Sequence, residues 1–87
     1  MSVKIVLPKL LHDAVGASIV RVQAKTLRQA FEEAYRKVPA LRFQLCGDDG
    51  SFRAHVLCFL NGENMRSLDV PVDEGDEISI LQAVSGG

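Results

Sequence analysis

The sequence predicts an α+β domain in which a mixed sheet of four to five strands packs against one main helix on one face. Two observations predict this class. Several short segments alternate apolar and polar residues, as strands with one buried face do. One longer segment between them carries a single apolar stripe at helical spacing. Strands on both sides of one helix in the sequence favour a two-layer arrangement.

The first strands are predicted in segments 2–7 and 18–23, where every second residue is apolar. The intervening residues 8–16 are expected to form a loop. The two segments are then expected to pair as antiparallel neighbours. The residues on their buried face are Val3, Ile5, Leu7, Val20 and Val22.

A helix is predicted from residue 27 to residue 38. Thr26 supplies an N-cap hydroxyl, and Gln29 stands at the position of a capping-box partner. Pro39 ends the helix, because proline disfavours helical geometry in the residue before it. The stripe consists of Leu27, Ala30, Phe31, Ala34, Tyr35 and Val38.

The segment 40–54 loses this period and is predicted as a surface loop with a turn at 47–50. The apolar residues Leu41, Phe43 and Leu45 are expected to tuck beneath it.

The last third of the chain has the pattern of three strands. A dense apolar run at 55–60 is followed by Asn-Gly at 61–62, a signal for a tight hairpin turn and a short return strand near residue 65. A second turn at 73–76 precedes the final strand, 77–81.

Composition excludes several classes of function. The formal net charge is −1, with Lys and Arg scattered, so the sequence lacks the basic stripe of a nucleic-acid-binding protein. The apolar segments are too short for a membrane span or a signal peptide, and we therefore expect a cytoplasmic protein. Cys46 and Cys58 have no metal-ligand spacing and are interpreted as reduced packing residues, and no metal site is predicted.

The sheet face away from the helix is predicted to be apolar. If Val56 and Cys58 face the helix, Leu57 and Phe59 point the other way. The same reasoning places Val6 and Leu81 on that face as well. Apolar residues on an uncovered face suggest a partner-binding surface. The alternative is that segment 40–54 folds over them.

The C-terminal third resembles the MoaD and ThiS family of ubiquitin-like sulfur carriers. The matching features are the acidic Gly turn 73–76, the strand after it, the hairpin 60–63 and the terminal Gly86-Gly87. The opening residues and the long segment before Val56 are most similar to the carriers that serve cysteine biosynthesis. The resemblance implies a β-grasp fold, with a domain over residues 1–83 and a flexible tail over residues 84–87.

The resemblance also implies a function that other proteins perform on this one. In the family, an E1-like adenylyltransferase/sulfurtransferase uses ATP to adenylate the terminal carboxylate, here Gly87, which then becomes a thiocarboxylate. Val84, Ser85 and Gly86 would form the tail that threads into the partner, and Leu81 corresponds to an interface residue. The chain is thus expected to be a non-enzymatic carrier with no bound cofactor. Its second partner would be a sulfur-accepting synthase, cysteine synthase-like or another.

Other functions stay open at this point. The chain also fits a ubiquitin-like covalent modifier, the small subunit of molybdopterin synthase, or a non-covalent adaptor. Asn64 and Gln82 depart from the residues usual in molybdenum-cofactor carriers. A catalytic role for His12 or His55 is disfavoured, because no nucleophile and base converge with them in the sequence.

Overall fold

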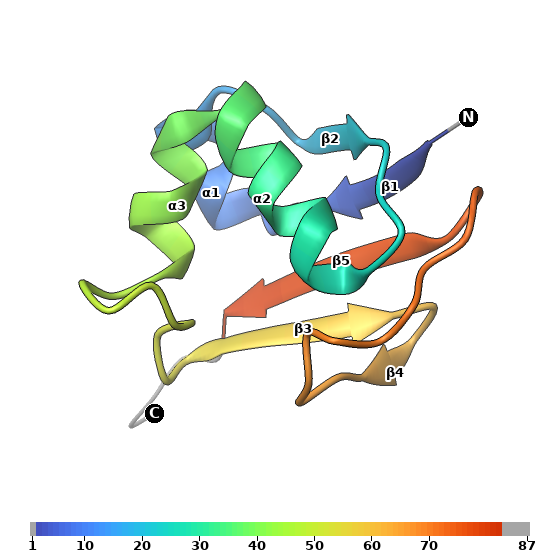
Figure 1. Ribbon diagram of the computed structural model, residues 1–87. Helices are drawn as coiled ribbons and strands as arrows, with labels where there is room; N and C mark the ends of the chain where they lie inside the picture. The colour runs from blue at the N-terminus through green and yellow to red at the C-terminus, as the bar shows by residue number, and fades with distance from the viewer. Residues whose placement is uncertain (1, 83–87) are drawn as a thin grey trace.

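The computed structural model describes residues 2–82, which form one five-stranded sheet and three helices (Figure 1). In chain order the elements are β1 (Val3–Val6), α1 (Lys9–Val15), β2 (Ile19–Val22), α2 (Leu27–Lys37), α3 (Pro39–Leu45), β3 (Val56–Leu60), β4 (Glu63–Asn64) and β5 (Glu77–Gln82). The strands lie side by side in the order β2-β1-β5-β3-β4. The predicted α+β class is confirmed.

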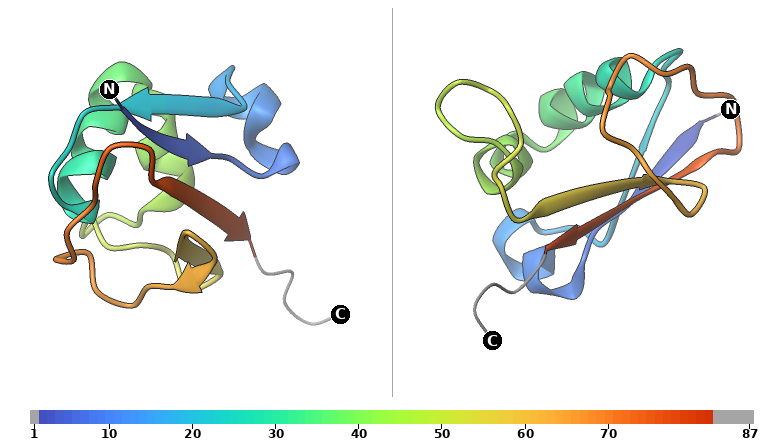
Figure 2. Two further views of the ribbon diagram at one scale, coloured as in Figure 1. Left: turned by 90° about the vertical axis from the view of Figure 1, so that its right-hand side faces the viewer. Right: turned by 90° about the horizontal axis from the view of Figure 1, so that it is seen from below.

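The sheet is mixed because its two halves are joined by one parallel pair. β1 pairs with β5 in parallel, with Ile5 opposite Ile78. The outer pairs, β1–β2 and β3–β5, are antiparallel, as predicted for β1 and β2. β5 therefore occupies the centre of the sheet although it is the last strand of the chain (Figure 2).

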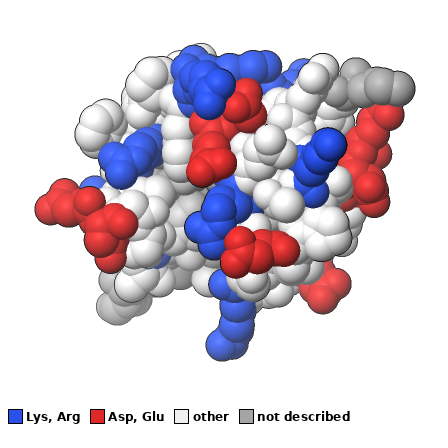
Figure 3. All heavy atoms as spheres, viewed as in Figure 1, with Lys and Arg blue, Asp and Glu red and all other residues white. Residues whose placement is uncertain are grey.

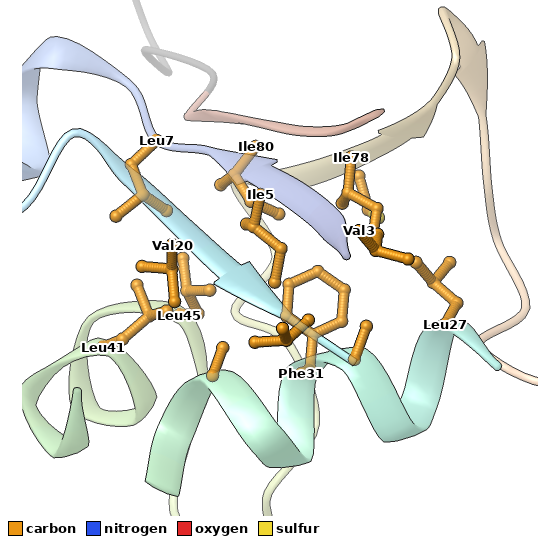
Figure 4. Close-up of a cluster of buried hydrophobic side chains, with 14 of the residues drawn as sticks. Val3, Ile5, Leu7, Val20, Leu27, Phe31, Leu41, Leu45, Ile78 and Ile80 are labelled. Carbon is orange, nitrogen blue, oxygen red and sulfur yellow. The ribbon is translucent and has the colours of Figure 1, made fainter. Parts of the chain in front are cut away.

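The core lies between the sheet and α2, as the two apolar periods require. Phe31 of α2 is 2% exposed and points at the sheet between residues of β1 and β5 (Figure 4). The ring of Phe52 meets the Phe31 ring edge-on, with 5.1 Å between centroids. The alternating residues of the strands face the same layer: Val3, Ile5, Val20, Val22, Cys58, Ile78 and Ile80 are all buried.

The first backbone N–H groups of α2 find hydrogen-bond acceptors in the Thr26 side chain and in the segment before β5. The Thr26 hydroxyl accepts a hydrogen bond from the Gln29 N–H at 3.1 Å, which confirms the predicted cap. The N–H groups of Leu27 and Arg28 donate to the carbonyls of Val70 and Leu68. The segment that leads into β5 thus holds the start of the helix. The Gln29 side chain accepts from the N–H of Lys25 rather than from that of Thr26, so the capping box is displaced by one residue.

The prediction of a loop at residues 8–16 is wrong, because this segment contains α1. Leu11 and Val15, four residues apart, share its buried side. Gly16 ends the helix in the left-handed conformation, with φ 75°. Pro8 before the helix and Gly16 after it are the boundary signals that sequence reasoning missed.

The segment 40–54 also differs from its prediction, because its first part is α3. Pro39 occupies the first turn of α3, where a missing N–H costs nothing, and so begins a helix as well as ending α2. Leu41 and Leu45 are fully buried, as expected, whereas Phe43 is 68% exposed. Because α3 packs on α1 and α2, this segment does not cover the other face of the sheet (Figure 1).

One turn follows the end of β3, and a second turn precedes the start of β5. Asn61 and Gly62 both have positive φ, as the tight hairpin turn requires. The Asn61 side chain then ties this turn to the next one: it accepts from the Glu77 N–H and donates to an Asp76 carboxylate oxygen. The other Asp76 oxygen accepts from the Asp73 N–H at 2.7 Å. The hydrogen bond from Asp73, followed by that from Asn61, lowers the pKa of Asp76 below its ordinary value of 3.8.

The exposed edge of β2 is blocked by a lysine from α2. The Lys37 ammonium group donates to the Arg21 carbonyl at 2.7 Å. That carbonyl would otherwise be an acceptor for a strand from another molecule.

We expect Phe31→Ala to lower the free energy of unfolding by about 3–5 kcal/mol, because it leaves a cavity at the centre of the core. Denaturant titration measures the change. Arg36→Ala in the same helix is the control, because the Arg36 side chain is 75% exposed in its ion pair with Glu33. Its effect should be below about 0.5 kcal/mol. Equal losses in the two variants would contradict this description of the core.

The Asp76 carboxyl is expected to titrate below pH 3.8 in the folded protein. Since its pKa is lowered on folding, its stabilising contribution is complete above the unfolded pKa and is lost as the pH falls through the folded pKa. NMR titration of the side-chain carboxyl carbon measures this pKa. Asn61→Ala should raise the pKa only partway, because the hydrogen bond from Asp73 remains. A wild-type midpoint at or above 3.8 would disprove the turn network.

Candidate functional site

The candidate site is the outer face of the sheet, the face directed away from α2 and α3. The strand register settles which residues share it. Ile5 and Ile78 are buried and opposite one another, so their neighbours Val6 and Ser79 pair on the outer face. Phe59 lies opposite Ser79 on the other side.

The structure brings the four predicted surface residues together. Leu57 and Leu81 are direct cross-strand partners, and Phe59 and Val6 flank Ser79 in the adjacent row. We call these residues, together with Ile19, the apolar patch. The patch spans β2, β1, β5 and β3.

The residues of the patch shield one another to different degrees. Leu81 is 48% exposed, and the other three predicted residues are half-buried. Neighbouring side chains on a pleated face cover part of each other's surface. A partner that docks here would bury the remaining apolar surface and would find Leu81 most accessible.

Sequence reasoning missed Ile19 and Leu10. Ile19 lies opposite Val6 and is 38% exposed, and the same alternation that buries Val20 places it on the outer face. Leu10 lies on α1 and is 73% exposed. Its exposure on a helix was not predicted, because residues 8–16 were expected to form a loop.

The residues of the outer face change from charged to apolar along β5. At its start, Glu77 forms an ion pair of 3.2 Å with Lys4. At its end, Leu81 and its partner Leu57 are apolar. The chain therefore passes from the apolar end of this face directly into residues 83–87. The predicted tail residues Val84, Ser85, Gly86 and Gly87 lie outside the described part of the chain, and the proposed domain boundary at residue 83 stays a prediction.

Both cysteines of the described chain lie within the core. Cys46 and Cys58 are free and buried, which agrees with the packing role predicted for them. Burial raises the pKa of the Cys58 thiol to about 11, so it is protonated at neutral pH and is a poor nucleophile. The His12 ring nitrogen Nε2 lies 3.0 Å from the Leu7 carbonyl, a local contact within the α1 connection.

Charge is spread evenly over the face that carries α2, where acidic and basic side chains intermingle (Figure 3). A hollow of about 450 Å³ lies between the start of β1 and the start of α2, at the end of the sheet opposite to Leu81. None of the helices within residues 2–82 has the length and apolar character needed to cross a bilayer.

A model of the ThiS family matches residues 5–87, nearly the whole chain and including both terminal glycines. The chain belongs to the ThiS family. The predicted relationship to the ubiquitin-like sulfur carriers is thereby confirmed. No curated protein sequence matches the chain.

Solved structures resemble this ThiS-family chain over at least 94% of its length. SAMP1 from Haloferax volcanii is 31% identical, with all of both chains covered and a TM-score of 0.88. CysO from Mycobacterium tuberculosis is 23% identical, covers 94% of this chain and 99% of its own, and has a TM-score of 0.82. A chain of the BexX/CysO complex from Amycolatopsis orientalis is 21% identical, covers 98% and 99%, and has a TM-score of 0.83.

These similarities confirm the predicted ubiquitin-like β-grasp fold. The two CysO comparisons, below 25% identity, bear on the fold alone.

Proposed function

We propose that this protein is a sulfur carrier, and that the carboxylate of Gly87 is adenylated by an E1-like enzyme and then converted to a thiocarboxylate. The main observation in support of this proposal is the position at which β5 ends. This central strand ends at the apolar end of the outer face, and the family match continues from it through Gly87. A partner docked on the apolar patch would therefore meet the tail where it leaves the domain.

The chemistry needs activation because a carboxylate is a poor electrophile. Attack of a carboxylate oxygen on the α-phosphorus of ATP forms an acyl-adenylate and releases pyrophosphate. A sulfur donor at the sulfide oxidation level then attacks the carbonyl carbon and releases AMP, which leaves a C–S bond in place of one C–O bond. The nucleotide and the sulfur donor are supplied by the partners, and this chain supplies the carboxylate.

Glycine at the last two positions suits this reaction sterically. Without a Cβ, Gly86 and Gly87 accept most backbone conformations and fit a narrow channel. Residues 84–87, when extended, reach at most about 14 Å. That reach is enough to carry the terminal carboxylate from a docked domain into an active site of the partner.

The sulfur acceptor that we favour is a synthase of cysteine biosynthesis or of another sulfur-containing metabolite or cofactor. The support is the fold similarity to CysO together with the resemblance of the opening residues to that branch. The structure of a BexX/CysO complex shows that a CysO protein assembles with another protein, BexX. We infer a comparable protein partner for this chain.

A second candidate, covalent protein modification, has its own support. The H. volcanii neighbour, 28% identical over 95% of the chain in a second structure, is described as a small archaeal modifier protein. Modifier and carrier share the adenylation step and differ in the nucleophile, which is a lysine amine in one and sulfur in the other. A molybdopterin synthase subunit is less favoured because Gln82 stands where those carriers usually have proline.

Intact-mass measurement tests the proposal directly. The protein is incubated with ATP, sulfide and an E1-like enzyme, and we expect one oxygen to be replaced by sulfur at the C-terminus. Deletion of Gly87 should abolish the exchange and leave the melting temperature unchanged, since a single residue at a chain terminus usually contributes little to stability.

Gly47→Ala is the matched control for the deletion. A Cβ at this glycine would meet only the Asp49 carboxylate, at an ordinary 3.7 Å, so the variant should fold and exchange normally. Lysine-linked conjugates without a sulfur exchange would favour the modifier. An inert C-terminus would refute both.

Docking on the apolar patch is tested by Phe59→Asp. We expect the affinity for the E1-like enzyme to fall about tenfold or more, since the charge would have to be desolvated in the interface. Isothermal titration measures this affinity. Phe43→Asp is the control, because Phe43 is also an exposed phenylalanine but lies on α3 in the helical layer. An equal loss in both variants, or none in Phe59→Asp, would remove the patch from the interface.

A further inference from the structure

Charged residues border the apolar patch at the end of the outer face where β5 begins. Lys4 of β1 lies directly opposite Arg21 of β2 on one side and opposite Glu77 of β5 on the other. Each of the three precedes a buried residue in its strand, so all three side chains belong to the outer face. They form one row across the sheet, next to the row that holds Val6 and Ile19.

The positive charge of Arg21 is not neutralised within residues 2–82. Glu77 pairs with Lys4 at 3.2 Å, and Arg21 forms no ion pair with a described residue. Only the backbone carbonyl of Arg21 is bonded, to the Lys37 ammonium group. Like charges directly opposite one another on a sheet are destabilising. The Arg21 guanidinium beside Lys4 therefore disfavours the isolated domain, and a carboxylate from another molecule would offset this effect.

A second arginine borders the patch at the opposite side of the sheet. The Met65 N–H donates to the Cys58 carbonyl at 2.8 Å, which continues the antiparallel register one residue beyond β4. The next residue, Arg66, therefore comes alongside Leu57 of the patch, and both line an open hollow of about 360 Å³. Arg66 is exposed, and its side chain has no ion pair or hydrogen bond with the described residues.

The outer face is therefore more positive than the molecule as a whole. Its outward strand positions together with Arg66 carry the basic residues Lys4, Arg21 and Arg66 and one acidic residue, Glu77. The formal net charge of the chain is −1. A second copy of this chain docked by the same face would bring like charges together, whereas an acidic surface would be attracted.

We propose that the E1-like partner presents carboxylates on two sides of its apolar contact area, one placed to pair with Arg66 and one with Arg21. This proposal rests on the proposed function, because it names the charge pattern of the protein that docks on the apolar patch. Arginine suits the role, since its guanidinium binds a carboxylate with two parallel hydrogen bonds. Charges at the rim of an interface mainly speed association, whereas the apolar centre slows dissociation.

The association and dissociation rate constants of the carrier with the E1-like enzyme test the proposal. Surface plasmon resonance without ATP measures both constants. We expect the double variant Arg21→Ser, Arg66→Ser to associate about tenfold more slowly at low ionic strength, with the dissociation rate changed less than about twofold. In about 1 M salt, where the screening length is about 3 Å, the association rates of variant and wild type should converge.

Arg36→Ser is the matched control, because it removes the same charge from α2 on the helical side of the domain. Arg66→Ser should slow association about threefold and Arg36→Ser less than about 1.5-fold. Arg66→Lys keeps the charge and should restore most of the rate. Arg21→Ser should not lower the melting temperature, because it removes a like charge from beside Lys4 and keeps the carbonyl that accepts from Lys37.

The proposal is overturned if the double variant associates as fast as the wild type, if Arg36→Ser loses as much as Arg66→Ser, or if the loss persists in high salt. A dimer of this chain that Phe59→Asp disrupts would also overturn it, by placing a second copy on the face. In each case sulfur exchange at Gly87 can still proceed at saturating enzyme, which leaves the carrier function standing. An inert Gly87 would refute the carrier function by itself.

Discussion

The parallel pairing of β1 with β5 is the constraint on which the rest of the molecule depends. It places the last strand at the centre of the sheet, with Ile5 against Ile78 over the core. Every outward-facing position on four strands follows from that register, because side chains alternate along each strand. A slip of one residue would turn Ile78 and Ile80 to solvent and bury Glu77. The same contact therefore fixes the core, the apolar patch and the position of Gln82 at the end of β5.

Much of this arrangement is contained in local sequence patterns. The alternation in β1, β2 and β5 predicts the strands and their buried residues, and the stripe from Leu27 predicts α2 and its Thr26 cap. The same alternation places Leu57, Phe59 and Leu81 on the outer face, since a residue next to a buried one in a strand must face the other way. These features depend on neighbouring residues alone, and the structure agrees with each placement.

What the sequence does not reveal depends on contacts between distant segments. α1 and α3 are seven residues each, too short for periodicity to distinguish them from loops, and they are stable because Leu11 and Leu41 are buried in the shared core. The hydrogen bonds from the start of α2 to Leu68 and Val70 join segments some forty residues apart. The apolar patch could be located by pattern, whereas the chemistry proposed for Gly87 is inferred from the family relationship.

Lys37, which donates a hydrogen bond to the Arg21 carbonyl on the edge of β2, affects whether copies of this protein can associate through their sheets. An edge strand with free backbone groups can pair with the edge strand of another copy, which leads to fibres. Lys37 places a positive charge on the β2 edge of the sheet. At the other edge, β4 is only two residues long, and Arg53 and Arg66 nearby would repel the same arginines of a second copy. Both edges of the sheet thus disfavour pairing between copies of this chain.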